Sequence, residues 1–90
     1  MYNYCQVIGT LKRVDETKRT LTLELQREFK NAEGVYEKYE IVAYIGNLYD
    51  FIKDYVEESI GTNIVIKGRI EPQKNDTCVF VGERIMGLSN

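Results

Sequence analysis

Aromatic rings and cations alternate within one short stretch of the chain. The rings are Phe29, Tyr36 and Tyr39, and the cations beside them are Arg27, Lys30 and Lys38. Flat rings stack on unpaired bases and cations attract the phosphates between them, so the two side-chain types together can hold a single strand without reading its sequence. This spacing predicts an interface for single-stranded nucleic acid.

Catalytic chemistry has no comparable pattern in the sequence. The chain contains no histidine. It also lacks an activated serine or cysteine arrangement, a glycine-rich phosphate loop, and carboxylates at a spacing that favours acid–base chemistry. We therefore expect a protein that is not an enzyme, with no catalytic residues and no cofactor.

The cysteines do not form a metal-binding pattern. Cys5 and Cys78 are far apart in the sequence, and histidine, the commonest metal ligand, is absent. Zinc sites need paired ligands at close spacing, so we expect no metal. Reduced structural thiols are the main interpretation. A disulfide between adjacent strands is the alternative, and it requires an oxidising compartment.

Length and composition indicate one small module. The chain has 90 residues, of which 43% are hydrophobic. That is enough for a single domain over residues 1–90 with one modest core. A domain of this size buries only about 60% of its unfolded surface, and self-association adds burial. We therefore expect a homodimer or a homotetramer.

The negative charge is concentrated in one segment. The chain carries a formal charge of -2 with a pI near 5.1. Residues 47–60 hold four acids against one lysine, a local charge of -3, so the rest carries -2 minus -3, or +1. We expect this segment to face solvent, away from an anionic ligand.

Neither end of the chain resembles a targeting segment. The N-terminus has no apolar signal region, and no apolar run approaches the roughly 20 residues of a membrane span. These features predict a cytoplasmic protein that does not contact the membrane.

Period-two alternation and turn residues predict the strands. Leu21, Leu23 and Leu25 should face a core, Gly9 should mark a bulge or a sharp bend, and Gly34 should allow the turn of a loop over residues 30–35. The sequence predicts strands over residues 2–11, 20–29, 36–46, 63–71 and 77–88.

The alternation of the second strand would point two unsuitable residues toward the core. Arg27 and Phe29 share the phase of the core leucines, and an inward arginine would be costly. A bulge near Gln26, or the exit of the strand from the barrel there, would resolve the conflict. In the next strand we expect Val42 and Tyr44 in the core and Tyr39 on the opposite, exposed face.

A single amphipathic helix is expected between the third and fourth strands. Asn47 is a favourable N-cap residue, and Gly61 can end the helix. Its predicted core stripe consists of Leu48, Phe51, Ile52, Tyr55, Val56 and Ile60.

The resulting order is β-β-β-α-β-β. This is the order of an OB-fold, a five-stranded Greek-key barrel with a helix at one end. The predicted fold class is therefore all-β, with one helix between strands 3 and 4.

At this point the chain resembles the bacterial and phage single-stranded DNA-binding proteins over nearly its whole length. It is similar to a short member without the acidic tail that recruits replication enzymes. The motifs that carry the resemblance are residues 7–11 (VIGTL), 27–30 (REFK), 46–48 (GNL) and 67–70 (KGRI).

The resemblance implies a set of binding residues. Phe29 and Tyr39 match the rings that stack on bases in that family, whereas Ile45 stands where a third ring is expected and residues 72–76 lack a further one. These departures imply a smaller footprint or weaker binding. Cations implied along the backbone are Arg27, Lys30, Lys38, Lys67 and Arg69, and further ring candidates are Tyr4 and Tyr36.

The expected function is single-stranded DNA binding in replication, recombination or repair, in the cytoplasm of a bacterial or phage-infected cell. Replication or recombination proteins are further expected partners. Two alternatives stay open: a primosome-type OB-fold adaptor whose main partner is a protein, and an RNA-binding OB-fold protein, because rings on strands can also stack on RNA bases.

Overall fold

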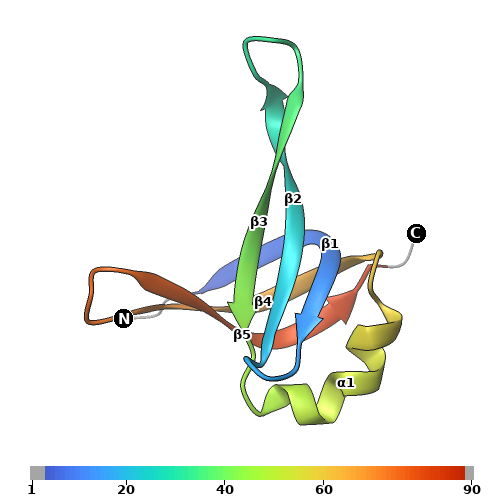
Figure 1. Cartoon of the computed structure of the whole chain (residues 1–90), viewed down its shortest axis with the longest axis vertical. Helices are drawn as coiled ribbons and strands as arrows, with labels where there is room; N and C mark the ends of the chain where they lie inside the picture. The colour runs from blue at the N-terminus through green and yellow to red at the C-terminus, as the bar shows by residue number, and fades with distance from the viewer. Residues whose placement is uncertain (1–3, 89–90) are drawn as a thin grey trace.

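A computed structural model describes residues 4–88 as a closed five-stranded barrel with one helix (Figure 1). The strands follow one another around the barrel in the order β1-β2-β3-β5-β4. The β3–β5 pair is parallel and the other pairs are antiparallel. The elements are β1 (Cys5–Asp15), β2 (Thr20–Lys30), β3 (Tyr36–Tyr44), α1 (Leu48–Glu58), β4 (Asn63–Pro72) and β5 (Cys78–Gly87). The predicted OB-fold is therefore confirmed.

Strand boundaries differ most from the expectation in β1. The first strand was expected to end at Leu11, but β1 continues to Asp15 because residues 13–15 pair with β2. Residues 2 and 3, where the strand was expected to begin, lie outside the described residues. β3 ends at Tyr44, two residues before Gly46.

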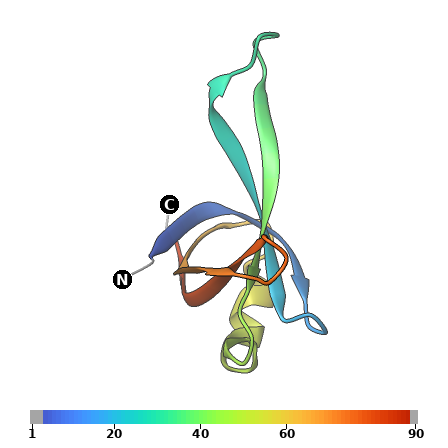
Figure 2. The ribbon, with the colours of Figure 1, turned by 90° about the vertical axis from the view of Figure 1, so that its left-hand side faces the viewer.

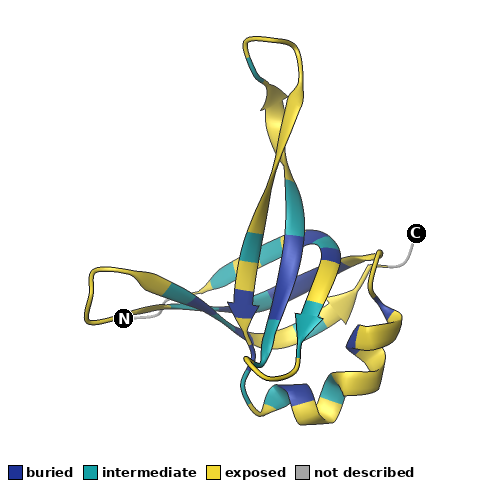
Figure 3. Cartoon of the chain, in the orientation of Figure 1, coloured by how far each residue is buried: buried dark blue, intermediate teal, exposed yellow. Residues whose placement is uncertain are grey.

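The core lies inside the barrel, as the alternating leucines predict. Leu21 and Leu23 are fully buried beside Leu11, Ile64 and Ile66. Figure 3 shows burial concentrated where the strands cross, and exposure along the two protruding hairpins. Burial of such aliphatic side chains is the main driving force for a domain of this size.

β1 bends at Gly9, as expected, because it belongs to both halves of the barrel. Residues 5–10 pair with β4 and residues 10–15 pair with β2. A Cβ atom at Gly9 would lie 2.7 Å from the Glu24 carbonyl oxygen. Only glycine permits this approach of two backbones.

The β2–β3 hairpin extends far beyond the barrel, which Figures 1 and 2 show from two directions. Its register shifts between Gln26 and Lys30. The bulge and the exit from the barrel both occur, so Arg27 and Phe29 are exposed although they share the phase of the core leucines. The predicted resolution of that conflict is confirmed.

The predicted core face of β3 is wrong. Tyr44 and Val42 are exposed, whereas Ala43 and Ile45 are buried. The register explains the difference, because Ala43 pairs with Leu21, a core residue, and neighbouring strands share an inward face. Tyr39 lies on this inward face and is exposed only because its part of the hairpin has left the barrel.

The predicted stripe of α1 is also wrong in part. The helix buries Tyr49 and Val56, whereas Phe51 is 85% exposed. The apolar residues of α1 form one stripe, and the barrel contacts the side of it that holds Tyr49 and Val56, whereas Phe51 lies at the opposite edge. Tyr55 and Ile60, which belong to the predicted stripe, are exposed as well, and Ile60 lies beyond the helix end. Asn47 is the N-cap, without a capping hydrogen bond from its side chain.

Candidate nucleic-acid interface

The hairpin forms a cleft with the predicted ring-and-cation residues on its walls. Phe29 is 78% exposed, and with Arg27, Lys30 and Tyr39 it lines a cavity of about 530 Å³. The bulge that follows Gln26 brings Arg27 and Phe29 to the same side as Tyr39. These four predicted site residues are therefore brought together by one structural feature.

The rings of the hairpin are held in place by cations. The Arg27 guanidinium lies 5.4 Å from the centre of the Tyr39 ring, and the Lys30 ammonium lies 5.5 Å from the centre of the Tyr36 ring. Arg27 also pairs with Glu37 at 3.2 Å. Cation–π contacts of this kind restrict both partners. The cleft therefore presents rings beside the cations Arg27 and Lys30, with Glu28 and Glu37 also on its walls.

A compact loop closes the hairpin. The Asn31 side-chain oxygen accepts hydrogen bonds from the backbone N–H groups of Glu33 (2.9 Å) and Val35 (3.0 Å). Gly34 has a φ of 79°, which favours glycine. The predicted loop and its glycine are confirmed, and the loop follows the Lys30–Tyr36 pair that ends the β2–β3 ladder.

The predicted cations differ in how much of their charge is available. Lys38 contacts Glu24 at 3.7 Å, and Arg69 contacts Glu71 and Glu83 at 3.0 and 2.7 Å. Within residues 4–88, Lys30 and Lys67 have no carboxylate partner. An internal carboxylate competes with phosphate, so Lys30 is the most available cation of the cleft.

Carboxylates face one another next to the cleft, where β2 and β3 still form the barrel. Glu24 lies opposite Glu40 in the register, and Lys12 and Arg13 of β1 compensate the pair. The Arg13 hydrogen bond lowers the pKa of Glu40 below its ordinary value. This network fixes β1, β2 and β3 together at the base of the hairpin.

The remaining predicted site residues lie away from the cleft. Lys67 is on β4 next to β1, opposite Gln6 on one side and Arg84 on the other. Arg69 is on β4 near the β4–β5 hairpin, and Tyr4 precedes β1 with an exposed ring. The structure does not bring these three residues together with Phe29 and Tyr39.

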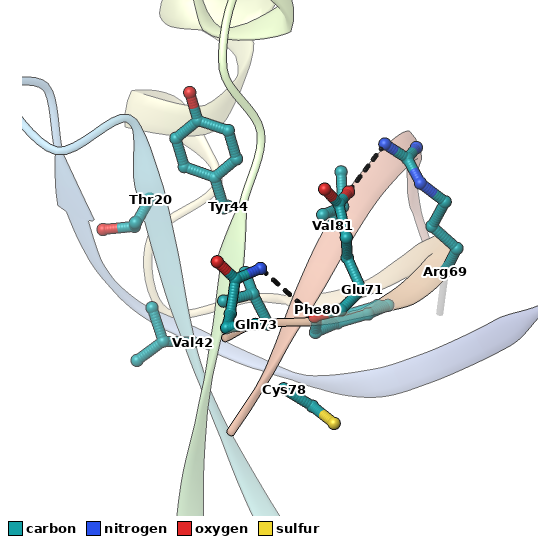
Figure 4. A pocket seen from close by; sticks show the side chains of 10 residues that line it. Thr20, Val42, Tyr44, Arg69, Glu71, Gln73, Cys78, Phe80 and Val81 are labelled. Atoms are coloured by element: carbon teal, nitrogen blue, oxygen red, sulfur yellow. Dashed lines mark hydrogen bonds and ion pairs between the residues drawn. The ribbon is translucent and has the colours of Figure 1, made fainter. Parts of the chain in front are cut away.

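Sequence reasoning missed Tyr44, which lines a second and larger groove. This groove has a volume of about 740 Å³ and runs between the outer face of β3 and the β4–β5 hairpin (Figure 4). The side-chain type could have indicated that Tyr44 is exposed. A buried tyrosine needs a hydrogen-bond partner for its hydroxyl group, and a surface position avoids that need. Its other lining residues include Val42, Val81, Gln73 and Glu71.

The position of Tyr44 depends on Gly46. A Cβ atom at Gly46 would lie 3.3 Å from the Tyr44 ring, and Gly46 has a φ of 53°. Ile45, where the family resemblance implied a ring, is 4% exposed and belongs to the core. The ring at this end of β3 is thus one residue earlier, on the outer face.

The Tyr44 groove continues toward the β1–β2 turn. Thr20 and Val42 line both this groove and a smaller cavity of about 320 Å³ that includes Lys18. The surface therefore crosses β2 and β3 between the β1–β2 and β4–β5 loops, which is where OB-folds bind oligonucleotides.

Solved structures of other proteins resemble this chain over nearly its whole length. A small single-stranded DNA-binding protein from Mycoplasma pneumoniae matches with a TM-score of 0.67 and 15% identity, covering 100% of this chain and 98% of that one. The chain has the fold of the single-stranded DNA-binding proteins. The resemblance inferred from the sequence is thus confirmed for the fold.

Other proteins with this fold come from distant organisms. Rim1, the mitochondrial single-stranded DNA-binding protein of S. cerevisiae, matches with a TM-score of 0.61 and 16% identity over 100% of this chain and 97% of its own. The Plasmodium falciparum protein, solved in complex with single-stranded DNA, matches with a TM-score of 0.58 and 13% identity, covering 99% of this chain and 96% of that one. No family model and no curated protein matches the sequence.

Residues 4–88 contain no helix long and apolar enough to cross a membrane. Among the same residues, no three side chains of histidine, cysteine, aspartate or glutamate gather where they could hold a metal ion. Cys5 and Cys78 are unpaired.

Proposed function

We propose that this chain binds single-stranded DNA with little sequence preference and performs no catalysis. The observation that carries the proposal is the hairpin cleft, where the exposed Phe29 ring lies beside Tyr39 and Arg27. An apolar ring in water on a protruding strand contributes little to folding, whereas a stacked base would cover it. The P. falciparum protein of the same fold, solved with single-stranded DNA, supports this proposal.

Each residue has a distinct role in the proposed complex. Phe29 and Tyr39 stack on bases, Tyr36 offers a further ring, and Lys30 attracts the phosphates. Arg27 and Lys38 contribute after their carboxylate partners are displaced or screened. Tyr44 extends the surface across β3. Tyr4 and Lys67 are peripheral to this path because they lie on other parts of the barrel, whereas Arg69 lines the same groove as Tyr44.

The wider role follows from the same proposal. We expect a homodimer or homotetramer that acts in DNA replication, recombination or repair, with proteins of these processes as further partners. We expect a cytoplasmic location in a bacterial or phage-infected cell.

The decisive experiment is a fluorescence titration with a dT oligonucleotide at low and high salt. Phe29→Ala and Tyr39→Ala should each weaken binding by about 1–3 kcal/mol, the range for a stacked base. Ile60→Ala removes an apolar side chain beyond helix α1 that is about as exposed as Tyr39, and it should leave the affinity unchanged. Absence of binding at low salt, or an unchanged double variant, would overturn the proposal.

One observation favours a protein-binding adaptor as a second candidate. Arg27, Lys38 and Arg69 each contact a carboxylate, which reduces the positive charge available to phosphate. An adaptor would show a stable protein partner and a dT affinity no better than non-specific. Competition with a matched rU oligonucleotide in the same titration separates DNA binding from RNA binding.

A further inference from the structure

Helix α1 exposes two aromatic rings to solvent. Phe51 is 85% exposed, the highest value among the large hydrophobic side chains of the described residues, and Tyr55 is also exposed. Residues four apart are neighbours on a helix surface, so the two rings lie next to each other along one face. Burial of a phenylalanine side chain contributes about 1.5–3 kcal/mol, and the folded chain does not gain this from Phe51. The rings therefore offer apolar surface to an external partner.

The barrel holds the Tyr55 side chain in position. A Cβ atom at Gly87 would lie 2.5 Å from the Tyr55 hydroxyl oxygen, so the tip of this side chain lies against the backbone at the end of β5. An anchor whose position is fixed in the free protein loses little conformational entropy when a partner binds. Tyr55 is therefore a pre-positioned part of the apolar surface.

Two carboxylates lie beside the rings. Asp54 and Glu58 follow Phe51 and Tyr55 by three residues each, and both are exposed without an ion pair within residues 4–88. Like charges four apart on a helix repel, and acids near its C-terminal end oppose the helix dipole. The last turn contains no basic residue that offsets this. A cation from outside would therefore be favourable here. We call these four residues the α1 face.

The α1 face is separate from the proposed DNA cleft. Figures 1 and 2 show α1 at the opposite end of the molecule from the tip of the β2–β3 hairpin. Lys53, the one cation of α1, pairs with Glu16 at 3.7 Å. The carboxylates of the α1 face repel phosphates, so a nucleic-acid strand does not suit this surface. A partner that binds here leaves the hairpin free.

We propose that the α1 face docks a basic segment of another protein, with lysine or arginine side chains around an apolar anchor. The anchor packs on Phe51 and Tyr55, and the cations pair with Asp54 and Glu58. Charge complementarity selects this occupant, because it favours a basic segment over an acidic one. Aromatic side chains are also enriched in protein–protein interfaces. The inference goes beyond the proposed DNA binding and does not rest on it.

A short, dye-labelled amphipathic peptide of leucine and lysine serves as the probe. The same peptide with glutamate in place of lysine is the negative probe. Fluorescence anisotropy should show binding of the basic peptide, weaker binding at high salt, and no binding of the acidic peptide. Amide chemical shifts of the isotope-labelled protein should change most in residues 51–58.

Single substitutions separate docking from general attraction between opposite charges. Phe51→Ala should weaken binding of the basic peptide about tenfold, because it removes the apolar anchor. Glu58→Lys should weaken binding and reduce its salt dependence. The matched controls are Val35→Ala and Glu33→Lys, which change an exposed apolar side chain and an exposed carboxylate of the β2–β3 loop. Both controls should bind the peptide as the natural chain does.

Circular dichroism checks that each variant is folded, and a dT titration of Phe51→Ala should give the affinity of the natural chain. Failure of the basic peptide to bind, or equal binding by Phe51→Ala and the natural chain, would overturn the docking site and leave DNA binding intact. Loss of dT binding alone would overturn only the proposed function. Association of the natural chain without peptide that Phe51→Ala abolishes would identify a second copy as the occupant and overturn the proposal.

Discussion

The Arg27 guanidinium lies over the Tyr39 ring at 5.4 Å and pairs at the same time with Glu37 at 3.2 Å. Arg27 thus holds a proposed stacking ring in place while a carboxylate offsets its charge. A phosphate that approaches the cleft meets Glu37 as well, so the free protein and the DNA complex compete for the same arginine.

Glu37→Gln should strengthen DNA binding. Removing the carboxylate charge frees Arg27 for phosphate and removes a repulsive group, so we expect an affinity gain of a few-fold, about 0.5–1 kcal/mol, as for an exposed ion pair. The measurement is a dT titration at low salt. Glu33→Gln, a charge neutralisation at the exposed loop, is the control. A weaker complex would show that Glu37 positions Arg27 and does not compete for it.

Lys30 should account for more of the salt dependence than Arg69. Lys30 has no carboxylate partner among the described residues, whereas Arg69 contacts Glu71 and Glu83. Lys30→Ala should therefore reduce the slope of log affinity against log salt by about 0.7, the value for one phosphate on a single strand. Arg69→Ala should leave the slope nearly unchanged. Equal slopes for both variants would remove Lys30 from the proposed path.

Tyr44 and Ile45 should separate binding from folding. Tyr44→Ala removes a ring from the outer groove and should weaken dT binding by about 1–3 kcal/mol with little change in stability. Ile45→Ala removes a core side chain and should lower the free energy of unfolding by about 2–4 kcal/mol. Titration and thermal unfolding of both variants check this. Normal dT binding by the Tyr44→Ala variant would restrict the DNA path to the hairpin.

The Arg13–Glu40 pair should stabilise the fold above acid pH. Its hydrogen bond lowers the pKa of Glu40 in the folded protein. The contribution is therefore present above the ordinary glutamate pKa, about 4.3, and is lost as the pH falls through the lowered folded value. Glu40→Gln should flatten the fall of the melting temperature below about pH 4. Glu28→Gln, which removes a carboxylate without an ion pair in the described residues, is the matched control.

Gly68 should tolerate no side chain. A Cβ atom there would lie 1.8 Å from the Val81 carbonyl oxygen, where β5 bulges against β4. The strands would have to separate, so we expect Gly68→Ala to lower the free energy of unfolding by about 3 kcal/mol or more. Chemical denaturation measures it. Gly34→Ala should lower the free energy of unfolding by less than Gly68→Ala. A Cβ atom at Gly34 would meet no neighbour, so only the positive φ disfavours alanine there.

The sequence by itself determined the order of elements, the buried leucines of β2, the bend at Gly9 and the ring-and-cation content of the hairpin. These features depend on local chemistry: period-two alternation, turn residues and the freedom of glycine. The conflict of phase at Arg27 and Phe29 even located the bulge, because a buried arginine is too costly to accept.

Only the tertiary structure decided which face of β3 and which side of α1 lie inward. Tyr44 and Ile45 are neighbours of opposite phase, and the pairing of Ala43 with Leu21 decided that Ile45 is buried and Tyr44 exposed. Tyr49 and Phe51 lie at opposite edges of the apolar stripe of helix α1, so the way the helix packs on the barrel decided that Tyr49 is buried and Phe51 exposed. Burial depends on partners distant in sequence, and local spacing does not specify those partners.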